Sequence, residues 1–211
     1  MFQDSPIFAV IYFAGALWLL NMWVADLRAF EKSGKPRAGA LEGAAGAPMK
    51  LVFAGVAAAL ALLAAHAQME AALGLDDEQS KVRVWAVFSW LAAAFIEELI
   101  FRGYLAVRGR GKFLLWVSVV LFSLIFALAH PFMWDYAVPD GGSVFGGAWK
   151  FDFSAKALFA TVAVFDCSML FYVLRFLPQN PKASILPCIA AHCAYNLGVF
   201  AIKAANGFVV F

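Results

Sequence analysis

The sequence predicts an all-α membrane protein, a polytopic bundle of about six transmembrane helices. Of its 211 residues 64% are hydrophobic and only 14% are charged. Soluble domains are usually about 45–50% apolar. The hydrophobic residues form several continuous runs, each close to the roughly 20 residues that a helix needs to cross the hydrocarbon core. These runs lack the alternating polarity of transmembrane β-strands, which excludes a β-barrel.

Six spans follow from the hydrophobic runs, at residues 6–27, 49–73, 83–107, 113–130, 155–177 and 184–205. The first run is too long for the apolar region of a signal peptide, so we expect it to be retained as a span. We divide the chain into two N-terminal spans with a cytoplasmic linker, residues 1–82, and a catalytic core of four spans, residues 83–211. Both parts belong to one continuous membrane domain.

Lys and Arg are distributed unevenly over the connections between the spans. The first, third and fifth connections carry ten of them, including Arg175 and Lys182 in the fifth, against five elsewhere outside the spans. The positive-inside rule puts these three connections in the cytoplasm and both termini on the outer side. The apolar spans predict a lipid bilayer as the surroundings. The basic residues form no continuous stripe, so we predict no nucleic-acid partner.

The longest outer connection, residues 131–152, combines glycines with aromatic residues such as Trp134 and Trp149. Trp and Tyr favour the boundary between hydrocarbon and headgroups. This composition favours an interfacial loop over a lid that gates access of a substrate.

Three charged residues, Glu97, Glu98 and Arg102, fall inside the third span. Each costs about 2.5–3.5 kcal/mol at the bilayer centre unless it is paired, protonated or turned to a protein interior. Glu98 and Arg102 are four residues apart in the favoured order, which predicts a salt bridge. Glu97 lies about 100° around the helix from Glu98 and faces a different wall. We therefore expect Glu98 to be structural and Glu97 to be free for proton transfer.

The fourth and sixth spans each carry a pair of residues four apart that projects from one helix face. Phe126 and His130 end the fourth span, and we expect Pro131 to stop the helix because a residue before proline avoids helical geometry. His192 and Asn196 lie in the sixth span. A histidine at a span end is usually interfacial and an asparagine usually joins helices. Together with the glutamates, however, they predict one polar site inside the bundle.

These side chains fit hydrolysis of a peptide bond. A glutamate and a histidine polarise a water molecule, and a second histidine with the asparagine donates hydrogen bonds to the developing oxyanion. Neither a serine nor a cysteine nucleophile is needed, and we expect no cofactor and no metal ion.

Three motifs resemble, in order, those of the CPBP (ABI) intramembrane proteases, which include the CAAX prenyl endopeptidases. The motifs are EExxxR at Glu97, Glu98 and Arg102, FxxxH at Phe126 and His130, and HxxxN at His192 and Asn196. The resemblance covers roughly residues 83–205. It implies a glutamic-type endopeptidase in which Glu97 and His130 activate water and His192 and Asn196 stabilise the oxyanion. Glu98, Arg102 and Phe126 would support these side chains.

Three alternatives remain open at this point. Two glutamates and two histidines could ligate zinc in a membrane metalloprotease, although the HExxH spacing is absent. A transporter or proton relay would also hold acids and histidines at depth, with Asp166 either as a further station or as the partner of a nearby cation. A scaffold without catalytic activity is the third. We expect His66 and Glu70, near the outer end of the second span, to be solvated and to have no role.

The short, Ala-rich chain indicates a bacterial source and hence the inner (cytoplasmic) membrane. A membrane-anchored protein tail reached from the outer side is then a better candidate substrate than a prenylated protein. One spacing is uneven, because His130 lies about 10 Å further along its helix than Glu97 when both are counted from a turn near Gly109. Tilted spans or a turn nearer Lys112 would reduce this offset.

Overall fold

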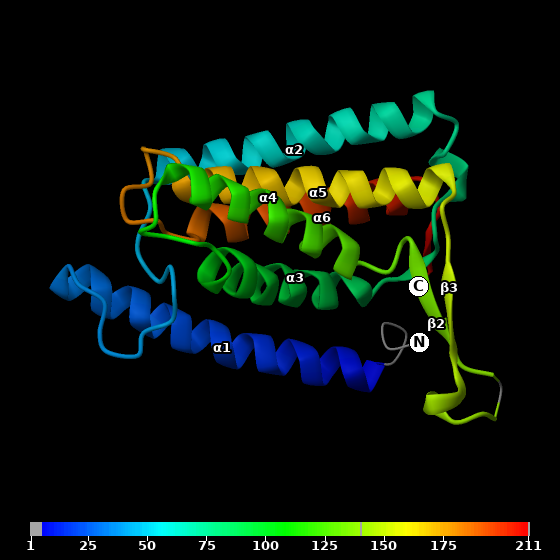
Figure 1. The fold of residues 1–211 in the computed structure, drawn as a ribbon, viewed down its shortest axis with the longest axis horizontal. Helices are drawn as coiled ribbons and strands as arrows, with labels where there is room; N and C mark the ends of the chain where they lie inside the picture. The colour runs from blue at the N-terminus through cyan, green and yellow to red at the C-terminus, as the bar shows by residue number, and fades with distance from the viewer. Residues whose placement is uncertain (1–5, 140, 211) are drawn as a thin grey trace.

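The computed structural model describes residues 6–139 and 141–210, and six α-helices make up most of this part (Figure 1). They are α1 (Pro6–Ser33), α2 (Met49–Ala72), α3 (Ala86–Glu97), α4 (Lys112–Ala129), α5 (Ala155–Phe176) and α6 (Leu186–Ala205). Among the described residues, all but α3 are long and apolar enough to cross a membrane. α3 continues directly into the π-helix η2 (Glu98–Tyr104), and the two together form the third predicted span. The all-α membrane bundle is confirmed.

Local signals explain several helix ends. Ser154 caps α5, because its side-chain oxygen accepts a hydrogen bond from the N–H of Ala157 at 3.3 Å. Pro187 lies in the first turn of α6, where its missing N–H costs nothing. α4 ends at Ala129, and His130 is extended with φ −78° and ψ 128°, as predicted for the residue before Pro131.

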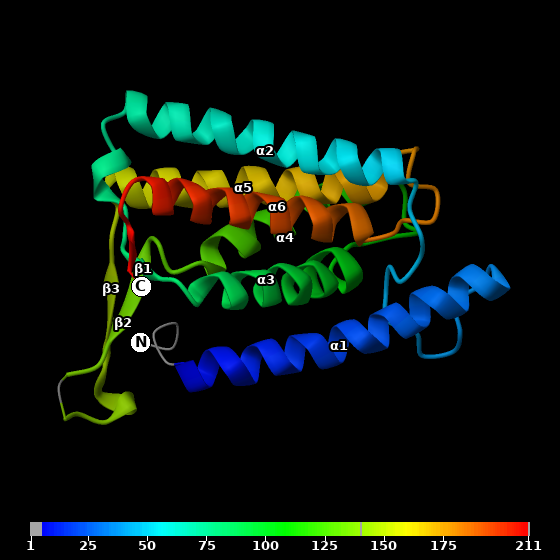
Figure 2. The same cartoon turned by 180° about the vertical axis from the view of Figure 1, so that it is seen from behind.

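The helices run back and forth along one direction, with α1 against α3 on one flank and α2 against α6 on the other (Figures 1 and 2). α1 begins and α6 ends at the same end of the bundle. The connections at 34–48, 105–111 and 177–185 lie at the opposite end, which agrees with the expected alternation of spans. That this second end is cytoplasmic stays a prediction, as does the division of the chain at residue 82.

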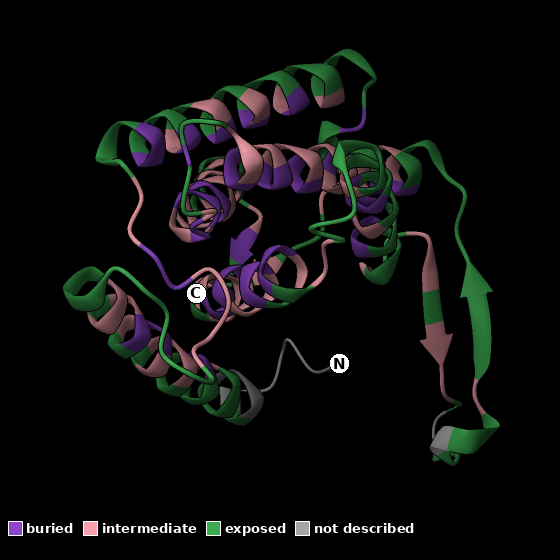
Figure 3. Ribbon diagram, turned by 60° about the vertical axis from the view of Figure 1, so that its left-hand side comes forward, coloured by how far each residue is buried: buried purple, intermediate pink, exposed green. Residues whose placement is uncertain are grey.

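Two small sheets lie at the end of the bundle where α6 ends. β1 (Val82–Arg83) pairs in parallel with β4 (Val209–Val210). β2 (Trp134–Ala137) and β3 (Ala148–Phe151) form an antiparallel hairpin that projects away from the helices (Figure 3). Two aromatic side chains of β3 are largely exposed, Trp149 at 60% and Phe151 at 66%. The long outer connection is therefore a defined hairpin, and its position at the membrane surface stays a prediction.

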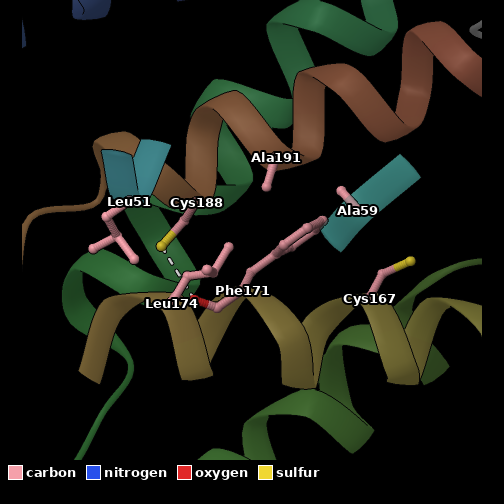
Figure 4. Close-up of a cluster of buried hydrophobic side chains, with 7 residues drawn as sticks. All are labelled: Leu51, Ala59, Cys167, Phe171, Leu174, Cys188 and Ala191. Atoms are coloured by element: carbon pink, nitrogen blue, oxygen red, sulfur yellow. Dashed lines mark hydrogen bonds between the residues drawn. The ribbon is translucent and has the colours of Figure 1, made fainter. Parts of the chain in front are cut away.

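A hydrophobic cluster joins α2, α5 and α6 at the centre of the bundle (Figure 4). Its buried members are Leu51, Ala59, Cys167, Phe171, Leu174, Cys188 and Ala191. The thiol of Cys188 donates a hydrogen bond to the carbonyl oxygen of Phe171 at 3.1 Å. The side chain of Phe171 stacks on the His192 ring, with ring centroids 4.9 Å apart. The apolar core thus extends directly to the polar residues of the third motif.

Candidate active site

Glu98 and Arg102 form the predicted salt bridge, with Glu98 Oε1 3.1 Å from Arg102 Nη1 and both side chains completely buried. Three rings surround the guanidinium, with its Cζ 4.6 Å from the ring centre of Phe126, 5.2 Å from Phe171 and 4.9 Å from Tyr172. Cations are attracted to aromatic faces, more strongly where water is excluded. The charge of Arg102 is therefore held inside the bundle by one carboxylate and three rings.

Two side chains of α5 stabilise the π-helix that carries Arg102. A helix end leaves carbonyl groups without partners in the helix itself. The hydroxyl of Tyr172 lies 2.8 Å from the carbonyl oxygen of Phe101 and 2.7 Å from that of Leu105. Arg175 Nη1 donates to the carbonyl oxygen of Gly103 at 3.0 Å. Arg175, which the charge count assigned to a connection, is instead a fully buried part of α5.

Glu97 occupies a different environment from Glu98, as the helical angle predicted. Its side chain is 26% exposed, whereas that of Glu98 is completely buried. His192 lies between the two carboxylates, with Nδ1 2.8 Å from Glu98 Oε1 and Nε2 3.8 Å from Glu97 Oε2. An ionised carboxylate only accepts hydrogen bonds, so Nδ1 of His192 carries the proton that Glu98 receives. Glu98 thereby fixes the orientation of the His192 ring and leaves Nε2 beside Glu97.

His130 is oriented by the helix that precedes it. Its Nδ1 lies 2.8 Å from the carbonyl oxygen of Phe126, which can only accept, so Nδ1 is the donor. In the neutral ring Nε2 then keeps its lone pair. The Phe126 ring lies 4.8 Å from the His130 ring and 6.3 Å from the His192 ring, measured between centroids. Phe126 therefore packs against both histidines of the site.

Asn196 is held by α3, because its side-chain Nδ2 donates to the carbonyl oxygen of Trp90 at 3.1 Å. A carboxamide nitrogen carries two hydrogens, so this contact fixes the amide and leaves its second N–H for another acceptor. The register between α3 and α6 thus orients Asn196 as well as His192.

One cavity of about 860 Å³ is lined by Glu97, Phe126, His130, His192 and Asn196 together. α3, α4 and α6 each contribute to its wall. Not all of these residues contact one another, however. Glu97 pairs with His192, while no hydrogen bond or ion pair joins Glu97 to His130 among the residues that the structure describes.

A second polar group in the same cavity was not predicted. Buried His66 lies with Nδ1 2.8 Å from the Tyr195 hydroxyl and Nε2 3.4 Å from Asp166 Oδ2. Glu70 pairs with Lys156. The expectation that His66 is solvated was wrong, because α5 and α6 cover this part of α2, which the sequence of α2 alone does not reveal. Asp166 takes the partner-pairing role, with His66 as its partner.

The described residues contain no group of three or more His, Cys, Asp or Glu side chains arranged to hold a metal ion. The salt bridge to Arg102 and the hydrogen bond from His192 both use Glu98 Oε1. The zinc alternative therefore has no preformed ligand set within the described ranges.

A family model described as type II CAAX prenyl endopeptidase Rce1-like matches residues 79–198. The matched segment contains every residue of the three motifs and more than half of the 211 residues. The chain belongs to this Rce1-like family. Neither a curated protein nor a solved structure matches the chain. Family membership makes it a CAAX-type intramembrane endopeptidase, hence a hydrolase with a protein substrate, and its long apolar helices make it an integral membrane protein.

Proposed function

We propose that this Rce1-like protein hydrolyses a peptide bond near the end of a membrane-anchored protein, with Glu97 as general base and without a metal ion. One observation carries the proposal: Glu97, His130, His192 and Asn196 line a single cavity inside the bundle. A partly exposed carboxylate beside a cavity can reach a water molecule, whereas the sealed carboxylate of Glu98 cannot.

Water activation is assigned to Glu97 and His130. Glu97 takes a proton from a water molecule in the cavity, and Nε2 of His130 accepts a hydrogen bond from the same water. The resulting hydroxide attacks the scissile carbonyl carbon. Contacts among catalytic groups are often long without substrate and tighten in the complex, so a water molecule between Glu97 and His130 needs no direct contact between the two side chains.

The oxyanion is assigned to His192 and Asn196. This role requires both ring nitrogens of His192 to carry hydrogen, with Nδ1–H donated to Glu98 at 2.8 Å and Nε2 lying 3.8 Å from Glu97. When Glu97 accepts the water proton it becomes neutral and no longer attracts the Nε2–H group, which then donates to the oxyanion together with the second N–H of Asn196. Glu97 then passes its proton to the leaving nitrogen as the C–N bond breaks, which restores the carboxylate.

The test compares the termini of membrane proteins by mass spectrometry in cells that carry the wild-type chain or Glu97→Gln. We expect at least one protein terminus that depends on Glu97. The matched control is Asp77→Asn, which removes a carboxylate from an exposed position outside the cavity and should leave all termini unchanged. Identical termini in wild-type and Glu97→Gln cells would contradict the proposal.

Metal dependence is tested on the purified protein. Proteolysis is expected to persist in a strong chelator, because the Glu98 oxygen that meets His192 is also the one paired with Arg102. Loss of cleavage in chelator and its return with zinc would establish the metalloprotease alternative instead.

The location is proposed as the bacterial inner membrane, with the connections 34–48, 105–111 and 177–185 in the cytoplasm. Single cysteines can be placed at Lys182 and Trp149, which lie at opposite ends of the bundle, in a background without the native cysteines. A membrane-impermeant maleimide should label Trp149→Cys in intact cells and Lys182→Cys only after permeabilisation. The reverse pattern would invert the topology.

A further inference from the structure

α5 carries an acidic side chain on its outer face at the middle of the span. Asp166 lies halfway between Ala155 and Phe176, about 16 Å from either end of the helix. Its side chain is 44% exposed. Neighbouring residues of α5, such as Ala163 and Cys167, line the cavity, whereas Asp166 does not. The exposed part of the carboxyl group therefore lies on the outer surface of the bundle.

The surroundings of this carboxyl group are apolar. Leu158 and Val162 lie two turns and one turn before Asp166 on the same side of α5, and they are 44% and 56% exposed. In a bilayer such a face meets hydrocarbon. Acidic side chains inside membranes are costly, and they are almost always paired or turned to a protein interior. A half-exposed carboxylate at this depth therefore calls for a counter-charge.

His66 supplies only part of what Asp166 needs. Its Nε2 lies 3.4 Å from Asp166 Oδ2, beyond the usual N–H···O distance of about 2.7–3.2 Å. Its Nδ1 lies 2.8 Å from the Tyr195 hydroxyl. A neutral ring makes both contacts, with Tyr195 donating to Nδ1 and Nε2–H facing the carboxylate. Within the described ranges no Lys or Arg lies within ion-pair distance of Asp166, and its Oδ1 accepts no hydrogen bond.

The missing cation has to come from outside this chain and from within the membrane. Lipid headgroups begin about 15 Å from the bilayer centre. A second copy of the chain is a poor source, because Arg102 is completely buried and the other basic residues of its described helices lie near helix ends. We infer that Asp166 binds a lysine or arginine at the middle of a partner protein's transmembrane helix, which packs against the outer face of α5. The inference does not depend on the proposed function.

Association with a synthetic transmembrane helix tests the inference. The probe is a helix of about 20 Leu and Ala residues, flanked by tryptophans, with either lysine or glutamine at its centre. Energy transfer between the labelled full-length protein and the labelled probe is measured in phosphatidylcholine vesicles. We expect the lysine probe to associate about tenfold or more tightly than the glutamine probe. Equal association of the two probes would overturn the inference, whether or not the protein proves to be a protease.

Variants assign the preference for lysine to one side chain. Asp166→Asn should lose the preference, and Asp166→Glu should keep it. Asp135→Asn is the matched control, because it removes an exposed carboxylate from the hairpin outside the bundle. Melting temperatures establish that each variant is folded. A preference for lysine that survives in folded Asp166→Asn would assign the cation to another group and overturn the inference.

The depth of the lysine supplies a test that needs no variant of the protein. Moving it from the centre of the probe by about seven residues, or about 10 Å, should remove most of the preference, because Asp166 lies at mid-span. Undiminished association of the shifted probe would overturn the inference. Energy transfer between two differently labelled samples of the protein measures self-association. Self-association that disappears in Asp166→Asn would assign this face to a second copy and would also overturn the inference.

Discussion

Glu97 and Glu98 are adjacent in sequence, but the side chain of Glu97 is partly exposed and that of Glu98 is completely buried. Glu98 is on the sealed side of the helix, bound by Arg102 and His192 among aromatic rings. Glu97 is on the open side, where its ionic neighbour among the described residues is the Nε2 atom of His192 at 3.8 Å. A step of one residue, about 100° around the helix, is therefore enough to place the Glu98 carboxylate in a buried ion pair and the Glu97 carboxylate beside the cavity.

The largest expected effect is on catalysis at the open side. Glu97→Gln keeps the shape of the side chain but removes the base, so kcat/KM should fall by about 10²–10⁴-fold. The melting temperature should stay close to that of the wild type, because Glu97 is 26% exposed and its contact with His192 is long at 3.8 Å. Steady-state kinetics and thermal unfolding in detergent measure the two quantities. A stable variant with undiminished kcat/KM would remove Glu97 from the mechanism.

A large effect on stability is expected at the sealed side. Arg102→Met leaves the buried Glu98 carboxylate without its guanidinium partner, which should cost about 3–5 kcal/mol of unfolding free energy. The double variant Glu98→Gln with Arg102→Met removes both charges and should recover part of this loss. Unfolding by denaturant in mixed micelles measures the difference. If the single variant is as stable as the double variant, the pair does not contribute as described.

Asn196 tests whether the open side also supplies the oxyanion donor. Asn196→Ala removes the amide that Trp90 holds in place, and kcat should fall by about 10²–10³-fold. KM should change little if the amide acts only in the transition state. A rise of KM with unchanged kcat would instead assign Asn196 to substrate binding.

The smallest effect concerns the support of the π-helix. Tyr172→Phe removes one buried hydroxyl near the carbonyl groups of Phe101 and Leu105, and should lower stability by about 0.5–1.5 kcal/mol. Tyr104→Phe is the matched control, because the residue is 55% exposed and lies in the same π-helix. Equal stabilities of the two variants would show that the Tyr172 hydroxyl does not support η2.

Local spacing predicted the parts of the site that lie on one helix. The pair of Glu98 and Arg102, the separate wall of Glu97 and the end of α4 at Pro131 all follow from helical geometry or from proline sterics. The π-helix did not follow, because its carbonyl groups are satisfied by Tyr172 and Arg175 from another span. Contacts between spans depend on how the helices shift along one another, which the sequence of one span does not encode.

The relative shift of the helices also explains two histidine contacts that the sequence did not predict. His192 meets both glutamates, and His66 is buried against Tyr195 and Asp166. Each contact joins helices that are far apart in the sequence. Motif order predicted that the site residues would gather, but it could not tell which histidine would pair with Glu97.

The parallel pairing of β1 with β4 has a practical consequence. Backbone hydrogen bonds from Val82 to Phe208 at 2.9 Å and from Val84 to Val210 at 3.0 Å connect the end of the described chain to the segment that enters α3. α3 and α6 carry Glu97 and His192. A fusion partner or affinity tag at the C-terminus is therefore expected to disturb the alignment of these two helices, and purification is better served by a tag at the other terminus.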